Sequence, residues 1–446
     1  MTQVDFLVIG GGISGLTTAW SLKQQGRDVL LLEAKEKVGG NIKSKNVDGW
    51  LLEEGPNSLL VNRQQVLDLF HDLEIESEVV LANEVSKNRF IFRDGRLHAL
   101  PGSPISFLGT GLFSFKDKLR LFAEPFIGKA KEEETIAEFV TRRLGKGFYD
   151  YAINPFVSGV YAGDPHLLSA RAATRKVYAL EEKHGSLVMG ALAMVLGKDR
   201  PEGRIKGRML SFRDGMATLP LAIGSALGGQ VITKARVESM QSGSKGWSVQ
   251  THEDRYEAKH VVLASTAREA ARLLGNDEAY KDLANIDYVP IAVMHLGFHA
   301  KDIRHALNGF GCLVPRKEGV KLLGALFSSS MFPGRSPSEE HALVTCFIGG
   351  ATFRDIANWD DEEIEGQVLC DLDRLIGFES EPIFKNLVRY ERSIPQYTMG
   401  HLERMNAIQS RVAALPNVTT RANWHDGISV SDCILNSLNH GRQLAP

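Results

Sequence analysis

The sequence predicts an α/β fold with three parts: a discontinuous Rossmann-like domain, an inserted mixed-sheet domain and a helical subdomain. Three observations lead to this prediction. They are a strand, a glycine turn and a helix at the N-terminus, a long apolar stretch with helical periodicity, and strand-like runs that return after it. The 446 residues are enough for two or three domains that each bury a core.

The N-terminal segment has the pattern of a βαβ unit. Residues 4–9 form a short apolar run that ends in glycines, residues 14–25 have helical character, and residues 28–33 form a second apolar run. Parallel strands of this kind place a ligand at their carboxyl ends. We therefore expect a binding site directly after residue 9.

Later segments complete the three parts. Asp94 and Gly95 lie between two strand-like runs, which is a strong signal for a two-residue hairpin. Helical periodicity follows, strands return near residues 230–238 and 260–264, and several strand-like runs occupy residues 289–348. We expect the Rossmann-like domain in residues 1–85, 205–285 and 400–446, the mixed-sheet domain in residues 86–101 and 286–399, and the helical subdomain in residues 102–204.

Composition and charge exclude several classes of partner. The net charge is −2, with 24% charged and 43% hydrophobic residues, so no bulk attraction to nucleic acid is expected. The four cysteines form no Cys-x-x-Cys pair, so we expect free thiols in a reducing, cytoplasmic compartment and no metal site. The first residues enter a strand without a signal peptide, and no apolar run reaches the roughly 18 residues of a spanning helix.

The first glycine turn predicts dinucleotide binding. It fits G-x-G-x-x-G between a strand and a helix, where glycines allow a tight turn and a close approach to a pyrophosphate. Glu33 ends the second strand, 18 residues after Gly15, and suits the hydroxyls of a ribose. The alternative is a turn that only packs helix on sheet. The motif residues are Gly10, Gly11, Gly12, Ile13, Ser14 and Gly15.

A second glycine pair favours FAD over a nicotinamide cofactor. Gly39 and Gly40 follow shortly after Glu33 and resemble the second fingerprint of flavoproteins, which a plain nicotinamide dehydrogenase does not need. Gly55, Pro56 and Asn57 come where such proteins run their backbone past the flavin. The structural alternative is a polar turn fixed by Gly-Pro.

Several narrower motifs, spread over nearly the whole chain, resemble the oxygen-dependent protoporphyrinogen oxidases of the amine-oxidase-like flavoprotein superfamily. The most specific is Phe-Val-Ser-Gly-Val-Tyr-Ala-Gly-Asp-Pro at residues 156–165. The others are Gly-Pro-Asn-Ser at 55–58, Asn-Arg-Phe at 88–90, Gly-Phe-Gly-Cys-Leu-Val-Pro at 309–315, Leu-Phe-Ser-Ser-Ser-Met-Phe-Pro at 326–333 and Ile-Pro-Gln-Tyr at 394–397.

The sequence departs from this family near its C-terminus. The family usually closes the flavin site with Ala-Gly-Asn and a smaller ring, whereas this chain reads Arg421, Ala422, Asn423 and Trp424. Residues 427–430 still match. The departure concerns the fine geometry beside the flavin and not FAD binding itself.

The resemblance implies oxidation of protoporphyrinogen IX in haem biosynthesis, with six electrons removed in three hydride transfers to FAD and O2 as acceptor. It assigns a propionate of the substrate to Arg89 and the faces of the macrocycle to Leu313, Leu326 and Phe347. Asn57 matches a polar residue near the reacting carbon. Without the resemblance, Arg89 reads as a surface arginine, the three apolar residues as core, and Asn57 as a turn residue.

The resemblance also assigns the cofactor residues. The pyrophosphate falls to the first glycine turn, the adenosine ribose to Glu33, an adenine contact to the Val237 backbone, and the flavin carbonyls to the helix start after residue 427. The full set is Gly10, Gly11, Gly12, Ile13, Ser14, Gly15, Glu33, Ala34, Gly40, Asn41, Gly55, Pro56, Asn57, Ser58, Val237, Asn423, Ile428, Ser429 and Val430.

Three other functions compete with this one. They are oxidation of coproporphyrinogen III, another flavin oxidoreduction such as that of amine oxidases or carotenoid desaturases, and partner binding without flavin, as in guanine nucleotide dissociation inhibitors. The expected partners are a porphyrinogen, O2, an anionic membrane surface and a second copy of the chain, and nucleic acid is not among them. For the membrane, residues 105–108 and 112–115 offer apolar anchors, followed by Lys116, Lys118 and Arg120. The alternative is that the phenylalanines there form the subdomain's own core.

Overall fold

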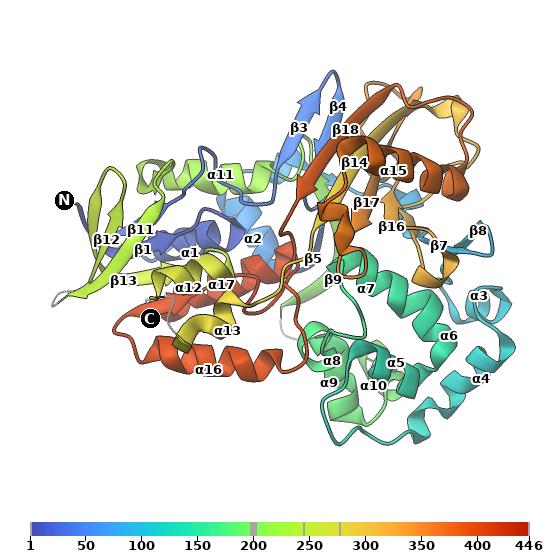
Figure 1. The fold of residues 1–446 in the computed structure, drawn as a ribbon, viewed down its shortest axis with the longest axis horizontal. Coiled ribbons are helices and arrows are strands. Elements are labelled where there is room, and N and C mark those ends of the chain that lie inside the picture. Colours follow the sequence, from blue (N-terminus) through green and yellow to red (C-terminus); the bar gives the residue numbers. More distant parts are fainter. Residues whose placement is uncertain (1, 197–202, 244–245, 276–277, 445–446) are drawn as a thin grey trace.

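A computed structural model describes residues 2–196, 203–243, 246–275 and 278–444 of the chain. Two seven-stranded sheets lie in different halves of the molecule, and a group of helices sits beside them (Figure 1). The predicted α/β fold class is confirmed. The division into domains at the residues given above stays a prediction.

The first sheet has the strand order β10-β2-β1-β13-β12-β11, and β19 pairs with β13. Its central strands are parallel, with Ile9 opposite both Leu32 and Leu263, and Leu263 opposite Thr420. Ile232 lies opposite Leu32 in the same way, so the carboxyl ends of five parallel strands meet at one edge. The strands are β1 (Thr2–Ile9), β2 (Val29–Leu32), β10 (Val231–Ile232), β11 (Val237–Gly243), β12 (Gly246–Thr251), β13 (Arg255–Leu263) and β19 (Val418–Thr420).

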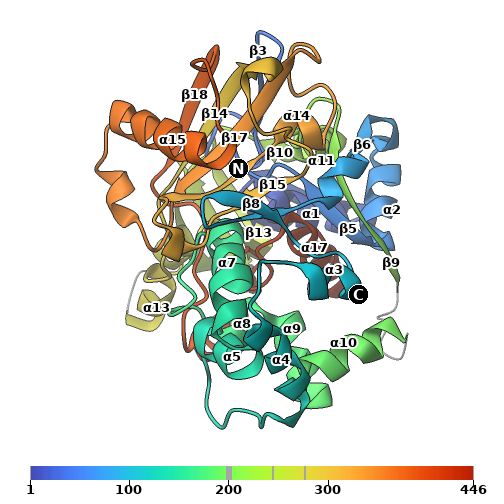
Figure 2. The same cartoon turned by 90° about the vertical axis from the view of Figure 1, so that its right-hand side faces the viewer.

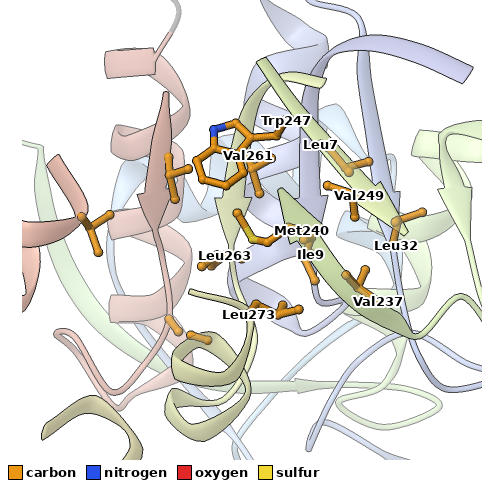
Figure 3. Packing of buried hydrophobic residues seen from close by; sticks show 14 of the residues in the cluster. Leu7, Ile9, Leu32, Val237, Met240, Trp247, Val249, Val261, Leu263 and Leu273 are labelled. Carbon is orange, nitrogen blue, oxygen red and sulfur yellow. The ribbon is translucent and has the colours of Figure 1, made fainter. Parts of the chain in front are cut away.

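Helices cover both faces of this sheet because its strands are apolar on both sides. Val8 points into one core and its neighbours Leu7 and Ile9 into the other. Figure 3 shows the second core, where Leu7 and Ile9 of β1 and Leu263 of β13 pack among side chains of β11 and β12. Helices α1 (Ile13–Gln24), α2 (Gln64–Asp72), α11 (Thr218–Leu227) and α17 (Val430–Leu444) contribute to the first core, and α12 (Ala267–Leu273), α13 (Lys281–Ala284) and α16 (His401–Ala413) to the second.

The second sheet is mixed and has the order β18-β14-β17-β16-β15-β7-β8. One face packs on α15 (Asp361–Ile376), which buries Ile364, Val368 and Leu372. The other face looks toward α7 (Asn154–Tyr161) (Figure 1). The strands are β7 (Phe90–Arg93), β8 (Arg96–Ala99), β14 (Ile291–His299), β15 (Gly311–Leu313), β16 (Leu322–Leu326), β17 (His341–Gly349) and β18 (Phe384–Tyr390).

The helical part lies in the lower half of Figure 2. At its centre, Arg143 is fully buried and pairs with both Glu124 and Glu181. None of the described helices combines the length and apolar composition needed to cross a membrane. The helices of the helical part include α3 (Pro104–Gly109), α4 (Phe115–Ala123), η3 (Glu124–Phe126), α5 (Ile136–Leu144), α6 (Lys146–Phe148), η4 (Tyr149–Ile153), α8 (Ala170–Ala173), α9 (Arg175–His184) and α10 (Leu187–Val195).

Two small sheets were not expected from the sequence. Strand β9 (Arg204–Phe212) lies between β5 (Leu59–Arg63) and β6 (Val79–Leu81). Strands β3 (Ser44–Val47) and β4 (Trp50–Glu53) form a hairpin. Residues 54–58 connect strand β4 of one small sheet to strand β5 of the other, so the two sheets fix both ends of this segment.

Candidate functional site

The first glycine turn is shaped by contacts that only glycine permits. A Cβ atom on Gly10, whose φ is +116°, would lie 2.8 Å from the Ala264 carbonyl oxygen, and one on Gly15 would lie 1.9 Å from the Gly10 oxygen. A Cβ on Gly12 would meet nothing within 4 Å. The turn is therefore tight against the sheet and open in front of Gly12, beside the start of α1, where an anionic group can approach.

Glu33 lies directly behind this turn and is buried. One of its carboxylate oxygens accepts a hydrogen bond from the Gly11 N–H at 2.7 Å, and the other accepts from the Lys35 N–H at 2.8 Å. No cation pairs with Glu33 among the described residues. A buried carboxylate that keeps free lone pairs and has no cation suits the hydroxyl donors of a ribose.

Val237 lies close to Glu33 along the same edge. The Ala235 N–H donates to the Glu33 carbonyl oxygen at 2.9 Å, two residues before Val237. The Val237 carbonyl oxygen accepts from the Arg272 guanidinium at 2.6 Å. This environment is compatible with the predicted adenine contact, which stays a prediction. Ala34 follows Glu33 in the same segment.

The second glycine pair touches the first turn. The Gly39 N–H donates to the Gly11 oxygen at 2.8 Å, and a Cβ on Gly40 would lie 3.2 Å from the Gly12 Cα. A Cβ on Gly55 would lie 1.9 Å from the Asn41 oxygen. The backbone thus brings the three glycine segments side by side, and residues 55–58 continue from them, all partly exposed.

Helix α17 starts at the same edge. The Arg421 N–H donates to the Leu263 oxygen at 2.9 Å, which continues the β13–β19 pairing. Further along, α17 packs on α1, where the Ser21 hydroxyl donates to the Leu438 oxygen at 3.0 Å. Ser429 caps α17 by accepting from the Asp432 N–H at 3.1 Å. Two helix N-termini therefore face one region, with Ile428, Ser429 and Val430 in the second of them.

Trp424 turns away from this region into the core. It is fully buried, and its indole N–H donates to the Ser265 carbonyl oxygen at 3.0 Å. The neighbouring Asn423 accepts a hydrogen bond at its carbonyl from the Tyr397 hydroxyl. Among the described residues, Arg421 Nε and His425 Nδ1 are buried without a hydrogen-bond partner. The atypical ring is therefore part of the core, and these two polar atoms of the same turn have no hydrogen-bond partner among the described residues.

These features together fit a dinucleotide such as FAD. The open front of Gly12, the uncompensated Glu33 carboxylate and the two helix N-termini supply donors, acceptors and space of the right kind along one sheet edge. The structure brings together the predicted residues of all three glycine segments and of residues 428–430. Their contact with a bound cofactor stays a prediction.

Three apolar residues of the second sheet share one face. Leu313 lies opposite Gly324, which in turn lies opposite Phe347, while Leu326 follows two residues after Gly324. All three side chains are partly exposed, whereas Cys312, Ala325 and Cys346 between them are buried in the opposite core. Helix α7 approaches this face so closely that a Cβ on Gly159 would lie 2.3 Å from Leu313 Cδ2. The residues are thus partly core and partly available to a flat ligand.

Arg89 is exposed and precedes β7, which pairs with β15 next to Leu313. Its guanidinium lies 5.2 Å from the centre of the Phe310 ring. No acidic side chain pairs with it among the described residues. An arginine without a carboxylate partner beside an apolar face is suited to a carboxylate-bearing ligand.

The residues around Asn57 include groups that the sequence did not reveal. A small cavity is lined by Asn57, Glu53, Ser328 and Arg335, together with apolar side chains. Burial raises the pKa of Glu53 to about 7, against the opposing effects of the Ser44 hydroxyl and Arg335. Glu53 could have been suspected from its place beside the Gly-Pro motif, but no sequence signal marks Arg335.

Comparisons with known proteins agree with this geometry. The family model for flavin-containing amine oxidoreductases matches residues 13–434. A protoporphyrinogen oxidase of Arabidopsis thaliana is 32% identical over 96% of this chain and 91% of its own, and a coproporphyrinogen III oxidase of Bacillus subtilis is 28% identical over 96% and 95%. The crystal structure of an Exiguobacterium protein, 23% identical, superposes with a TM-score of 0.83 over 100% of this chain and 98% of that one.

Proposed function

The chain belongs to the flavin-containing amine oxidoreductase family, and from this membership we propose that it is an FAD-dependent oxidase of protoporphyrinogen IX in haem biosynthesis. The observation that carries the proposal is the similarity to protoporphyrinogen oxidases over nearly the whole chain. The apolar sheet face with Arg89 beside it supports the same substrate class, a broad apolar disc with carboxylates at its rim.

FAD supplies a two-electron acceptor when it is bound. In the proposed arrangement, the turn around Gly12 binds the pyrophosphate and Glu33 accepts hydrogen bonds from the adenosine ribose. Residues 55–58 run along the flavin, and the start of α17 donates backbone N–H groups to its pyrimidine carbonyls. These contributions come from backbone and one carboxylate, which explains the glycine content of the site.

The substrate needs to be oriented more than activated. Protoporphyrinogen IX loses six hydrogens in three two-electron steps, and three O2 molecules would be reduced to three H2O2. In the proposed site, Leu313, Leu326 and Phe347 hold the macrocycle, and Arg89 binds a propionate. Asn57 borders the reacting carbon. Each step also releases one proton to solvent, and over the three steps two of these protons come in net from pyrrole N–H groups and one from the remaining methylene bridge, so a strong side-chain base is not required.

Initial rates with two porphyrinogens test the proposal. Protoporphyrinogen IX and coproporphyrinogen III are each prepared without O2 and mixed with the purified, FAD-loaded protein. Porphyrin fluorescence is then followed after O2 is admitted. We expect the higher kcat/KM with protoporphyrinogen IX. Coproporphyrinogen III is the second candidate because the Bacillus subtilis oxidase also matches nearly end to end. Oxidation of neither compound above the uncatalysed rate would refute the proposed function.

We further propose that an apolar patch on the helical part attaches the protein to a membrane surface. The patch consists of Ile105, Leu108, Phe115, Leu119, Phe122, Phe126, Leu192, Val195 and Leu196, all exposed. Its helices adjoin one another, because Lys118 of α4 donates to the Leu108 oxygen of α3 and Glu124 of η3 accepts from the Leu187 N–H of α10. An exposed apolar surface of this kind suits lipid more than water.

The structure corrects part of the expected anchor. Phe113 is only 5% exposed and stacks on Phe148 with ring centres 4.3 Å apart, so it belongs to the core. Lys118 and Arg120 donate to backbone carbonyls, which leaves Lys116 as the exposed cation of the three. Attachment should therefore depend mainly on apolar contact and only weakly on salt.

Co-sedimentation with anionic liposomes tests the attachment. Phe115→Ser/Phe122→Ser removes two side chains that are 75% and 71% exposed, so it should abolish binding without disturbing the fold. Leu81→Ser/Ile383→Ser is the matched control, since both residues are exposed apolar positions outside the patch. A wild-type protein that stays in the supernatant would refute attachment.

A cytoplasmic location and a homodimer stay predictions. Light scattering on the purified protein tests the dimer.

A further inference from the structure

The turn that leads into α17 contains a buried ion pair that spans it from end to end. Arg421 lies at its start and is almost completely buried, and its guanidinium is 2.5 Å from the Asp426 carboxylate near its end. The same guanidinium also donates to the Asp426 carbonyl oxygen at 3.0 Å. Asn436, within α17, donates to the Asp426 carboxylate at 2.9 Å. One side chain thus ties the beginning of the turn to its end and to the helix that follows.

Both ends of this turn are held by the elements that form the cofactor site. Arg421 is joined through its backbone to β13, next to the strand that leads into the first glycine turn. Beyond Asp426, the Gly427 carbonyl accepts from the Cys433 thiol at 3.2 Å, and residues 428–430 start α17. The shape of residues 421–427 therefore determines how the chain passes from β19 to the first residues of α17.

Stability alone is a poor explanation for the pair. Removing two charges from water costs about as much as their attraction returns, so a buried ion pair often adds little to the free energy of unfolding compared with apolar residues of similar size. Trp424 already anchors the turn in the core. What a buried ion pair can add is a single defined arrangement of the groups around it, because it leaves few alternatives that keep both charges satisfied.

We propose that Arg421 and Asp426 are positioning residues for the cofactor: their ion pair fixes the turn in the shape that presents the backbone of residues 428–430 to FAD. This inference rests on the proposed function, since it presumes that FAD occupies the site. Although burial opposes ionisation, Arg421 holds the pKa of Asp426 below its usual value, so the pair is charged at neutral pH. Neither side chain needs to touch FAD for this effect.

The test compares FAD affinity in variants of the full-length protein. Asp426→Asn leaves the Arg421 charge buried without a carboxylate, and we expect the dissociation constant of FAD, titrated into the apoprotein, to rise roughly ten-fold or more. The visible circular dichroism of the bound flavin should change as well, because it reports the surroundings of the ring. Arg421→Gln/Asp426→Asn carries no lone buried charge and gives the same comparison if the single variant does not fold.

A matched control separates positioning from stability. Glu124→Gln breaks the buried pair with Arg143 in the helical part, so it should lower the unfolding temperature and leave FAD affinity unchanged. If Asp426→Asn and the double variant both fold and keep wild-type FAD affinity and flavin dichroism, the inference is wrong. If the wild-type protein itself binds no FAD in this titration, the proposed function fails instead.

Discussion

Glycine meets two different needs in the first turn, and the two can be separated by substitution. At Gly10 a side chain would collide with the backbone of Ala264, so a larger residue there should damage the fold. At Gly12 a side chain would project into open space. We therefore expect a larger residue at position 12 to be compatible with the fold and to obstruct a ligand in front of it.

Gly12→Val should therefore fold normally and lose FAD. We expect an unfolding temperature of the apoprotein close to that of the wild type and a flavin content after purification that is close to zero. Gly95→Val is not a suitable control, because Gly95 has a φ of +77°. Gly102→Val is suitable, since its Cβ also meets open space and no positive φ is involved. A Gly12→Val protein with full flavin content would show that the cofactor is placed wrongly.

Arg89 offers a second test at the level of one residue. Removing its charge should raise KM for a porphyrinogen, because a charged hydrogen bond worth about 1.5 to 3 kcal/mol is lost. Flavin content should not change, since Arg89 is exposed and is not among the predicted cofactor residues. Steady-state kinetics of Arg89→Ala and Arg89→Lys would show this. Unchanged kinetics in the alanine variant would remove Arg89 from the site.

At the level of elements, β13, β19 and α17 are joined by two histidines that share one hydroxyl. His260 and His440 each lie 3.1 Å from the Thr419 hydroxyl through their Nε2 atoms. Burial lowers the pKa of both histidines to about 4, and for His440 the nearby Arg421 acts in the same direction. Both rings are therefore neutral at physiological pH.

This arrangement predicts acid sensitivity. The pKa of His440 is about 4 in the folded protein and 6.5 in the unfolded chain. Its contribution to stability is therefore fully present above pH 6.5 and is lost as the pH falls toward about 4. His440→Gln keeps a hydrogen-bonding group that does not titrate. Urea unfolding between these two pH values should show a smaller loss of stability in the variant, by about 1 to 3 kcal/mol. An equal loss of stability in the wild type and in His440→Gln would show that His440 is not the group responsible for the acid sensitivity.

For the whole molecule, local patterns were predictable and long-range pairings were not. The βαβ unit of residues 4–33 follows from apolar runs around glycines, and the Asp94–Gly95 hairpin formed as predicted, with both residues at positive φ. The parallel pairing of β7 with β15 joins segments more than 200 residues apart, which no local pattern encodes. The same holds for Phe113, which is buried where it stacks on Phe148, whereas Phe115, two residues later, is exposed.

In the candidate site, too, some residues could be predicted from local sequence patterns and others could not. Its glycine segments and Glu33 could be found in the sequence because close backbone contact and a ribose hydroxyl each demand a particular residue type. The shared face of Leu313, Leu326 and Phe347 was suggested by resemblance and depends on strand register. The Arg421–Asp426 pair was visible only as an unusual segment, since a sequence does not show which buried charges will meet.

Arg335 links the two halves of the molecule and allows a prediction at that scale. It is buried in the segment after α14 (Ser328–Met331), its guanidinium donates to the Ser211 hydroxyl of β9 at 2.7 Å, and it lies 3.7 Å from the Glu53 carboxylate of β4. The link therefore runs from the second sheet to the strands beside the cofactor segments. Asn57 lines the cavity next to it.

Arg335→Met should destabilise the protein more as the pH rises. Glu53 already has a pKa raised to about 7, so its folded form holds a proton more tightly than the unfolded chain does, and this contribution is present at low pH and lost as the pH rises through about 7. Without Arg335 the pKa should rise further. At about pH 6 the Glu53 carboxyl of the variant stays protonated. At about pH 8.5 it must either be a buried, unpaired charge or keep a proton against the pH, and either lowers the free energy of unfolding by on the order of 3 kcal/mol. Urea unfolding at both pH values measures the difference, and Glu53→Gln/Arg335→Met should remove its pH dependence. A loss that is the same at both pH values would show that Arg335 acts by packing and hydrogen bonding to β9 alone.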